Sequence, residues 1–261
     1  MEPTNNTQST APVTSQKAAN TLAVPIAIVL AAGLIAGAIY LNGKNPQPVV
    51  TKNAPPVEEK VVFRPVDKTD HIRGNPNAPI MLVEYSDYDC PFCKQFHDTL
   101  TQVMKDYGVD GKVAWVYRQL PLQQLHPNAP KIAIAAECVA ELAGNDGFWK
   151  FSDRIFSEKT DRDFTNMSRI TEYATGAGAE KSAFELCYNS NKTKDKVDAS
   201  IAEAAKAGAR GTPHTFVLVG DQRTVINGAQ PYPVVKQVID NILAQIEGGK
   251  GALKADTTTT Q

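Results

Sequence analysis

The sequence predicts one α/β domain that follows a single membrane-spanning helix, and three observations point to this fold class. Residues 21–41 carry no charged side chain, and a helix needs about 20 apolar residues to cross a bilayer. Residues 68–247 alternate between short β-branched or aromatic runs and segments with helical spacing of apolar side chains. Hydrophobic residues make up 42% of the chain and charged residues 21%, which is an ordinary globular composition.

The N-terminal part divides into three segments by composition. Residues 1–20 are polar and lack periodicity, so we expect a disordered leader. Residues 21–41 are interpreted as an uncleaved anchor, because a secretory signal has a basic start and an apolar stretch of only about 7–15 residues, whereas Lys17 is the sole cation here. A cleaved signal is the alternative. Residues 42–67 contain five prolines and are expected to form an extended spacer, in which Val61–Val66 could be an edge strand.

The α/β domain begins with an apolar run suited to a buried strand, followed by a helix whose apolar side chains recur at helical spacing. A β-branched and aromatic run comes next, and then a long helical block. Two short strands around a Gly-Asp turn and a last helix complete the domain. In chain order the predicted elements are strand 80–85, helix 91–107, strand 112–120, helical block 130–208, strands 215–219 and 224–226, helix 234–246 and a disordered tail at 248–261.

A Cys-x-x-Cys pair, Cys90 and Cys93, stands where a strand is followed by a helix. The strand ends near Tyr85, and Pro91 suits the first helical position because its missing N–H costs nothing there. A helix N-terminus favours negative charge, so Cys90 is predicted to be an exposed, reactive thiolate. Cys93 lies three residues later on the same helix face, which makes it the buried partner that resolves mixed disulfides.

Metal and nucleic-acid binding are not predicted. One Cys-x-x-Cys pair supplies two ligands, whereas a structural zinc site needs four, and no second pair or His-x-x-x-His follows. The formal net charge of -1 leaves no excess of Lys and Arg for phosphate groups. No cofactor is predicted either. An incidental, unreactive cysteine pair is the alternative to redox chemistry.

A second feature, Thr212-Pro213, precedes the predicted strand at 215–219. A cis peptide bond is possible here because X–Pro bonds tolerate this isomer. A cis-proline loop would present the Thr212 backbone to an extended polypeptide, and with Pro91 and Phe92 it would form a small apolar patch that binds substrate. A proline that only ends the helical block is the alternative.

Four separated motifs occur in the order DYDCPFCKQFH, YRQLPLxxxHPNA, AAEC and ARGTPHTFV. Together they resemble the DsbA-like disulfide oxidoreductases of the thioredoxin superfamily, and the resemblance covers about residues 68–247. It implies a thioredoxin fold with an inserted helical domain at about 127–208. It also implies that Cys90 is the nucleophile, that Cys93 is its partner, and that Pro213 is a cis-proline facing the active site.

Residues around the pair affect the expected chemistry. Family resemblance suggests that Glu84 is a partly buried acid that assists proton transfer near the cysteines, and a surface strand residue is the alternative. Phe92 can neither donate a hydrogen bond nor carry charge, so one source of thiolate stabilisation is missing. Asp87 and Asp89 lie just before Cys90 and would raise its pKa. These departures predict a milder oxidant than the strongly oxidising archetype and leave the direction of electron flow open.

The other cysteines and the histidines have less specific patterns. Cys138 and Cys187 sit in predicted helical segments, where they are either buried free thiols or a structural disulfide that joins two helices. His97, four residues after Cys93, is expected to face solvent, and a position on the same helix face as the cysteines is the alternative. His126 and His214 are expected to be loop and strand-surface residues rather than catalysts.

We predict that the oxidised Cys90–Cys93 pair forms disulfides in exported, cysteine-containing proteins. A quinone-linked membrane partner would reoxidise the pair, and the anchor would keep the domain beside that partner. Disulfides persist outside the cytoplasm, so the domain is expected on the extracytoplasmic side of the cell membrane. The alternatives are a reductase or isomerase with the same fold, and a peptide-binding or chaperone module whose thiols are incidental.

Overall fold

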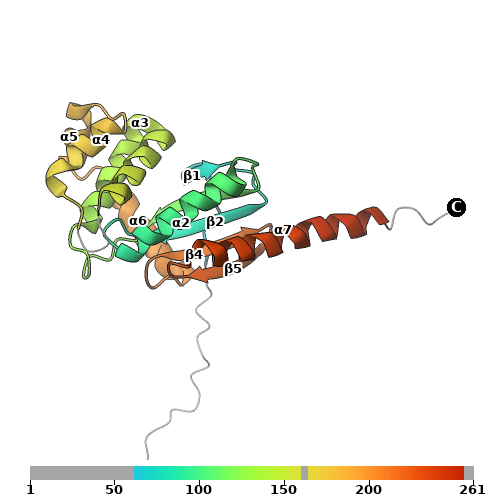
Figure 1. Cartoon of the computed structure of the whole chain (residues 1–261). Helices are drawn as coiled ribbons and strands as arrows, with labels where there is room; N and C mark the ends of the chain where they lie inside the picture. Colours follow the sequence, from blue (N-terminus) through green and yellow to red (C-terminus); the bar gives the residue numbers. More distant parts are fainter. Residues whose placement is uncertain (1–61, 160–163, 256–261) are drawn as a thin grey trace, which may run out of the picture. The chain divides into compact units, whose positions relative to one another are not determined.

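The computed structural model describes residues 62–159 and 164–255, so the predicted leader, the predicted anchor and most of the predicted spacer lie outside the described residues. Within these two ranges, no helix has both the length and the apolar character needed to cross a membrane. The elements shown in Figure 1 are, in chain order, β1 (His71–Gly74), β2 (Ile80–Ser86), α2 (Pro91–Val103) with a π-helical turn at Met104–Gly108, β3 (Val113–Gln119), α3 (Ala129–Glu158), a 3-10 turn at Met167–Arg169, α4 (Ile170–Gly176), α5 (Lys181–Asn189), α6 (Lys194–Ala207), β4 (His214–Val219), β5 (Gln222–Asn227) and α7 (Tyr232–Ala255).

A five-stranded sheet with the order β1-β3-β2-β4-β5 forms the centre of the fold. β2 and β3 are parallel, and α2 lies between them in the chain as the crossover that parallel strands need. The other neighbouring strands pair antiparallel. The loop after β2, which carries the cysteine pair, therefore lies at the carboxyl end of the two central strands, where α/β sheets commonly place their functional residues.

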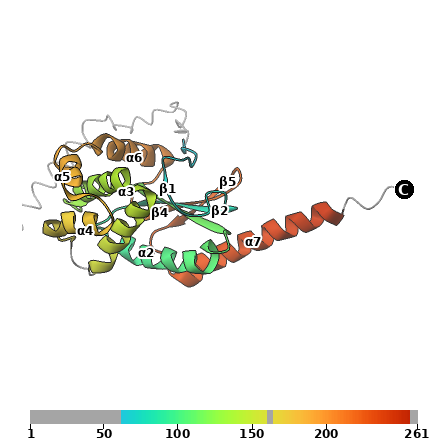
Figure 2. The same ribbon diagram turned by 90° about the horizontal axis from the view of Figure 1, so that it is seen from above.

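Alternate side chains of the central strands face two separate cores. Leu82 and Trp115 pack in the larger core with apolar residues of α2, α3 and α7, whereas Val83 and Tyr85 pack in a smaller core with α6. Figure 2 shows α2 and α7 on one side of the sheet and α6 on the other. Phe96, one turn beyond the cysteine pair, is fully buried in the larger core and fixes the first turns of α2 against the sheet.

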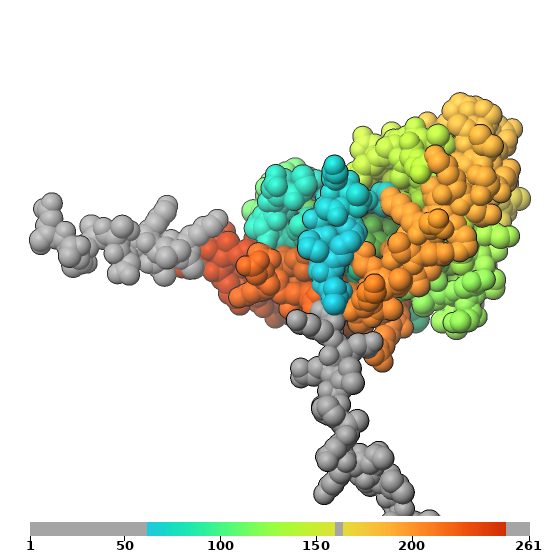
Figure 3. Space-filling view, turned by 180° about the vertical axis from the view of Figure 1, so that it is seen from behind, coloured from blue at the N-terminus to red at the C-terminus, as the bar shows by residue number. Residues whose placement is uncertain are grey.

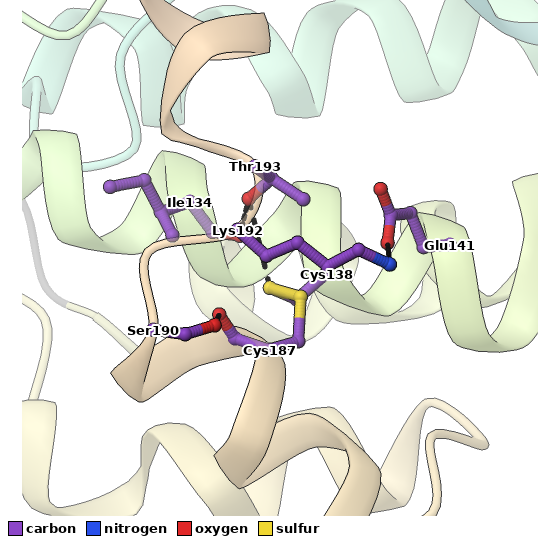
Figure 4. The surroundings of a disulfide bond; sticks show 7 residues. All are labelled: Ile134, Cys138, Glu141, Cys187, Ser190, Lys192 and Thr193. Carbon is purple, nitrogen blue, oxygen red and sulfur yellow. Dashed lines mark hydrogen bonds and ion pairs between the residues drawn. A yellow bond between two sulfur atoms is a disulfide. The ribbon is translucent and has the colours of Figure 1, made fainter.

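The helices α3 to α6 form an insertion between β3 and β4, as the family resemblance implied. α3 is kinked at Gly144, whose φ of 70° is a conformation that glycine adopts at little cost. Cys138 of α3 and Cys187 of α5 form a disulfide whose Cα atoms are 5.9 Å apart (Figure 4). Beside it, the Thr193 hydroxyl donates to the carbonyl oxygen of Ile134. Of the two alternatives for these cysteines, the structure contains the disulfide.

The first described segment does not form the edge strand predicted for Val61–Val66, because no strand is present from residue 62 to 70. Side chains hold it in place instead. The Phe63 ring packs edge-on against Phe216 with centroids 5.0 Å apart, and Arg64 donates to the carboxylate of Asp70 at 2.5 Å. Figure 3 shows this start of the described chain, in cyan, beside α6, in orange. The packing of Phe63 on Phe216 is a long-range contact that a local strand pattern does not reveal.

Two further elements differ from the sequence prediction. β1 was not predicted, because its four residues, HIRG, include only one strongly apolar side chain, that of Ile72. α7 continues to Ala255, so residues 248–255 are helical where a disordered tail was predicted. Glycines in this stretch weaken a helix by about 1 kcal/mol each relative to alanine, and they do not end it here. The rest of the predicted tail, residues 256–261, lies outside the described residues.

Candidate active site

The helix α2 begins at the predicted redox pair. Cys90 is the N-cap of α2, with φ -72° and ψ 125°, and Pro91 occupies the first turn. The backbone N–H of Cys90 donates to the carbonyl oxygen of Asp87 at 3.2 Å, which closes the loop after β2 into a tight turn. The unpaired N–H groups of the first helical turn are therefore available to the sulfur of Cys90.

The surroundings of Cys90 favour its thiolate form. A hydrogen bond from the Cys93 thiol lowers the pKa of Cys90 to about 6, with further help from the backbone N–H groups of Cys93 and Phe92, and this outweighs the opposing effect of burial. An ordinary cysteine titrates near about 8.5. The Cys90 thiol is consequently ionised for the most part at neutral pH, as a nucleophilic thiol requires.

Cys90 is not the exposed residue that the sequence predicted, because only 4% of its surface is accessible. Its sulfur lies 3.6 Å from the carbonyl oxygen of Thr212, in the loop before β4. The peptide bond between Thr212 and Pro213 is cis. This loop follows 122 residues later in the chain, and it packs against the thiol, which no local pattern could indicate. The structure thus brings Thr212 and Pro213 to the cysteine pair.

Cys93 has the opposite protonation preference. It is completely buried, and burial raises its pKa well above the ordinary value, an effect that hydrogen bonding to Cys90 reinforces. The backbone N–H of Asp87 donates to the Cys93 sulfur at 3.5 Å. The two shifts separate the roles of the pair, because one sulfur is ionised and available for attack while its partner holds a proton.

Glu84 is buried on β2, so the alternative of a surface strand residue is wrong. Its carboxylate accepts a hydrogen bond from the Ser86 hydroxyl at 2.7 Å and one from the Trp115 indole N–H at 2.9 Å. Burial raises the pKa of Glu84 to about 7 in spite of these two bonds, and negative charge on Cys90 contributes in the same direction. A carboxyl group that titrates near neutrality can both accept and donate protons under working conditions.

The two aspartates before the nucleophile are buried, and their charges are engaged by the helical insertion. Asp89 accepts two hydrogen bonds from Thr165 and lies 3.9 Å from the ammonium group of Lys159. Asp87 accepts a hydrogen bond from His126 at 2.8 Å. Donors from the insertion therefore compensate both carboxylates. The pKa of Cys90 is lowered overall, so the raising effect predicted for the two aspartates does not prevail.

His97 is buried, so the prediction of a solvent-facing histidine is wrong. The side of α2 that carries His97 packs against α3. Nε2 of His97 lies 2.8 Å from the carboxylate of Asp153, which belongs to α3. The ring packs against Trp115 and Phe156, and burial lowers its pKa. His214 begins β4 and is only partly buried, which agrees with a strand residue near the surface.

Two residues at the back of the active-site loop were missed by sequence reasoning. His126 was interpreted as an ordinary loop residue, although it belongs to the HPNA segment that carried part of the family resemblance. Lys159 follows the end of α3, and its buried ammonium group donates to the carbonyl oxygen of Tyr88 at 2.8 Å. A lysine in a polar stretch gives no sequence signal of burial, because lysine is almost always exposed.

Comparison with known proteins places the chain in a family. The family model described as Thioredoxin matches residues 66–241. The chain belongs to the thioredoxin family. Among curated proteins, this thioredoxin-family chain is 34% identical over 159 residues to the Na(+)/H(+) antiporter NhaA 1 of Mycolicibacterium gilvum, a match that covers 60% of this chain and 24% of the antiporter. The chain thus spans about a quarter of the length of the curated relatives it matches.

Solved structures show which form of the thioredoxin fold the chain has. It is similar to oxidised BdbD from Bacillus subtilis, with 22% identity and a TM-score of 0.60, over 70% of this chain and 97% of BdbD. It is similar to α-DsbA1 from Wolbachia pipientis, with 22% identity and a TM-score of 0.59, over 76% and 98% of the two chains. DsbA from Chlamydia trachomatis has 16% identity and a TM-score of 0.58, over 75% and 99%. The described residues therefore have a DsbA-like thioredoxin fold with a helical insertion.

Proposed function

We propose that this thioredoxin-family chain is a thiol–disulfide oxidoreductase that forms disulfide bonds in exported proteins through Cys90 and Cys93. The observation that carries the proposal is the opposite protonation of the two thiols. The pKa of Cys90 falls to about 6 and that of Cys93 rises well above its ordinary value. The DsbA-like fold supports the same chemistry, although a fold alone does not define an activity.

The reaction starts from a disulfide between the two cysteines. A substrate thiolate attacks the sulfur of Cys90, a substrate–Cys90 disulfide forms, and the Cys90–Cys93 bond breaks with its electron pair on the sulfur of Cys93. A second substrate thiolate then attacks the substrate sulfur of this mixed disulfide and releases Cys90 as a thiolate. Two substrate thiols are oxidised and the cysteine pair is reduced. Glu84, whose charge acts on Cys93, exchanges the proton that Cys93 takes up.

The lowered pKa of Cys90 supports substrate oxidation as the proposed direction of electron flow. A thiolate exists only in the reduced pair, so every interaction that stabilises this thiolate stabilises the reduced form. A stable reduced form makes the oxidised pair a stronger oxidant. Phe92 contributes no side-chain hydrogen bond, but the Cys93 thiol and the helix N-terminus compensate for it. We therefore propose substrate oxidation, and a measured reduction potential of the cysteine pair distinguishes it from the alternative of reduction.

Exposed apolar side chains near the active-site loop offer a surface for unfolded substrate. Phe92 is 59% exposed next to the nucleophile, and Leu125 is 67% exposed in the loop before α3. Phe164 is 54% exposed, and its ring lies 6.3 Å from that of His126. Together with the Thr212-Pro213 loop, these residues are the proposed binding patch, which contacts apolar side chains of an extended polypeptide with little sequence preference.

The location of the chain is part of the proposal. Residues 21–41 are proposed to anchor the chain in the cell membrane with the catalytic domain on the extracytoplasmic side, where disulfides persist. A quinone-linked membrane protein is the proposed partner that reoxidises the cysteine pair. The long apolar segment and the thiol chemistry of the domain support this arrangement.

The proposal is tested by letting the oxidised full-length chain, purified in detergent, react with short reduced peptides. With a peptide that contains two cysteines, we expect nearly one peptide disulfide per chain, because the lowered pKa of Cys90 favours the reduced pair. With a peptide that contains one cysteine, mass spectrometry after acid quenching should find the peptide attached to Cys90. Attachment to Cys93, or a peptide that stays reduced in both mixtures, would contradict the proposed oxidation.

A further inference from the structure

A buried carboxylate behind the active-site loop is tied to the helical insertion. Oδ1 of Asp87 accepts the backbone N–H of Asp89 at 2.8 Å. Oδ2 accepts the backbone N–H of Leu122 at 2.7 Å and Nδ1–H of His126 at 2.8 Å. Among the described residues, His126 is the one side chain that donates to Asp87. The contact between His126 and Asp87 requires a proton on Nδ1 of His126, because an ionised carboxylate can only accept hydrogen bonds.

The backbone of Asp87 contacts the reacting sulfur. Its N–H donates to Sγ of Cys93 at 3.5 Å, and its carbonyl oxygen accepts the N–H of Cys90 at 3.2 Å. Asp87 is therefore held at three points: its side chain contacts the insertion, and its N–H and carbonyl groups each contact one cysteine of the pair. A rotation of this residue that broke the carboxylate contacts would also move the N–H away from the Cys93 sulfur.

The Cys93 sulfur needs such a donor during one particular step. When a substrate thiolate attacks the Cys90–Cys93 disulfide at Cys90, the electron pair of the broken bond passes to the sulfur of Cys93. Burial raises the pKa of Cys93 well above the ordinary value, which makes it a poor leaving group. A fixed N–H that points at the sulfur stabilises the charge as it develops, in the manner of an oxyanion hole.

We propose that Asp87 and His126 are a positioning pair for the leaving sulfur of Cys93. His126 holds the carboxylate of Asp87, and Asp87 holds its own N–H on Sγ of Cys93, so departure of the Cys93 thiolate is faster. The inference rests on the proposed function, because it concerns one step of the same thiol–disulfide exchange. It gives the histidine of the HPNA segment a role in the active site that its loop position did not suggest.

The inference predicts that His126 variants separate two reactions. In one assay, glutathione reduces the oxidised full-length chain in detergent, and Cys93 is the leaving group. In the other, iodoacetamide alkylates Cys90 of the reduced chain, and Cys93 does not leave. We expect His126→Ala to slow the first reaction about tenfold, while the second stays within about twofold of wild type.

Two matched variants serve as controls. His126→Gln keeps an N–H donor that can reach the carboxylate, so it should restore most of the lost rate. Gln124→Ala removes an exposed side chain from the same loop and should behave like wild type in both assays. Should His126→Ala fail to fold, Asp87→Asn, which replaces one accepting oxygen by a donor, is expected to give the same separation of the two reactions.

The outcomes distinguish the inference from the proposed function. A wild-type chain that glutathione does not reduce would remove the proposed function together with this inference. A wild-type chain that reacts, with His126→Ala equally fast, would remove the inference alone. Equal slowing of both reactions, or a His126→Gln variant as slow as His126→Ala, would also overturn the positioning role, because the effect would then be a general distortion of the loop.

Discussion

Replacing Cys138 and Cys187 together by alanine is expected to lower the free energy of unfolding by about 4 kcal/mol. The disulfide joins α3 to α5 across a sequence separation of 49 residues. A cross-link of this length removes many conformations from the unfolded chain, and loops of about 15 to 100 residues correspond to about 3–5 kcal/mol in the chain-entropy account. Urea-induced unfolding of the full-length chain in detergent, with the Cys90–Cys93 pair in the same redox state in both proteins, measures the difference.

Reductant provides the control for this prediction. Complete reduction of the wild-type chain opens the same loop without changing the sequence, so its unfolding midpoint should move to that of the double variant. The double variant has no Cys138–Cys187 disulfide, so any change of its unfolding midpoint with reductant comes from Cys90 and Cys93 alone. A loss of less than about 1 kcal/mol, or a wild-type midpoint that reductant leaves unchanged, would show that the disulfide does not stabilise the insertion.

Glu84→Gln is expected to have a pH-dependent effect on the free energy of unfolding of the reduced protein. The change that the substitution causes should be about 3 kcal/mol more favourable at alkaline pH than at about pH 4.5. Burial raises the pKa of Glu84 from 4.5 to about 7 on folding. Between these values the folded chain binds a proton that the unfolded chain releases, so stability falls as pH rises. The contribution of the protonated acid is fully present below pH 4.5 and is lost as pH passes about 7. A glutamine cannot ionise, so it avoids this loss.

Urea unfolding of Glu84→Gln and wild type at about pH 4.5 and about pH 8 measures this effect. Asp70 is the control, because its carboxylate is also buried but its pKa is lowered below the ordinary value, where hydrogen bonds and attraction from Arg118 and Arg64 overcome burial. Arginine stays charged at both pH values and the titration window of Asp70 lies below them, so Asp70→Asn should destabilise the protein by a similar amount at both. A Glu84→Gln effect that does not change with pH would contradict a raised pKa at this position.

The same substitution is expected to cost activity, which explains why a destabilising acid is present at all. Exchange of a proton with Cys93 needs a group that titrates near neutrality, and the amide of the Glu84→Gln variant could not supply it. Functional sites commonly retain groups that lower the stability of the fold. The energetic cost of Glu84 is therefore part of the proposed mechanism.

Local patterns predicted the parts of the site that are themselves local. The apolar run before Cys90, the proline after it and the helical spacing beyond it placed the pair at the start of a helix, and α2 begins at Pro91 as expected. These features depend on residues within one or two turns of each other, where spacing and chemistry carry enough information. That the Pro213 loop faces the pair was implied by the family resemblance and not by a local pattern.

Packing between distant segments set the rest, and the sequence could not show it. The burial of Cys90 depends on Thr212, which lies 122 positions away in the chain. Asp87 and Asp89 were interpreted by their charge alone, whereas hydrogen bonds to the insertion determine their effect. His97 was assigned to solvent because its helix was considered without α3, which covers that face. Each error came from treating one element without the neighbour that packs against it.

The central claim is that Cys90 is a thiolate at neutral pH, and the pH dependence of its alkylation tests this most directly. The full-length chain is reduced at Cys90 and Cys93, and iodoacetamide modification of Cys90 is followed by mass spectrometry across the pH range. The rate should rise with a midpoint near the Cys90 pKa of about 6. A midpoint near about 8.5, the value for a free cysteine, would contradict the account.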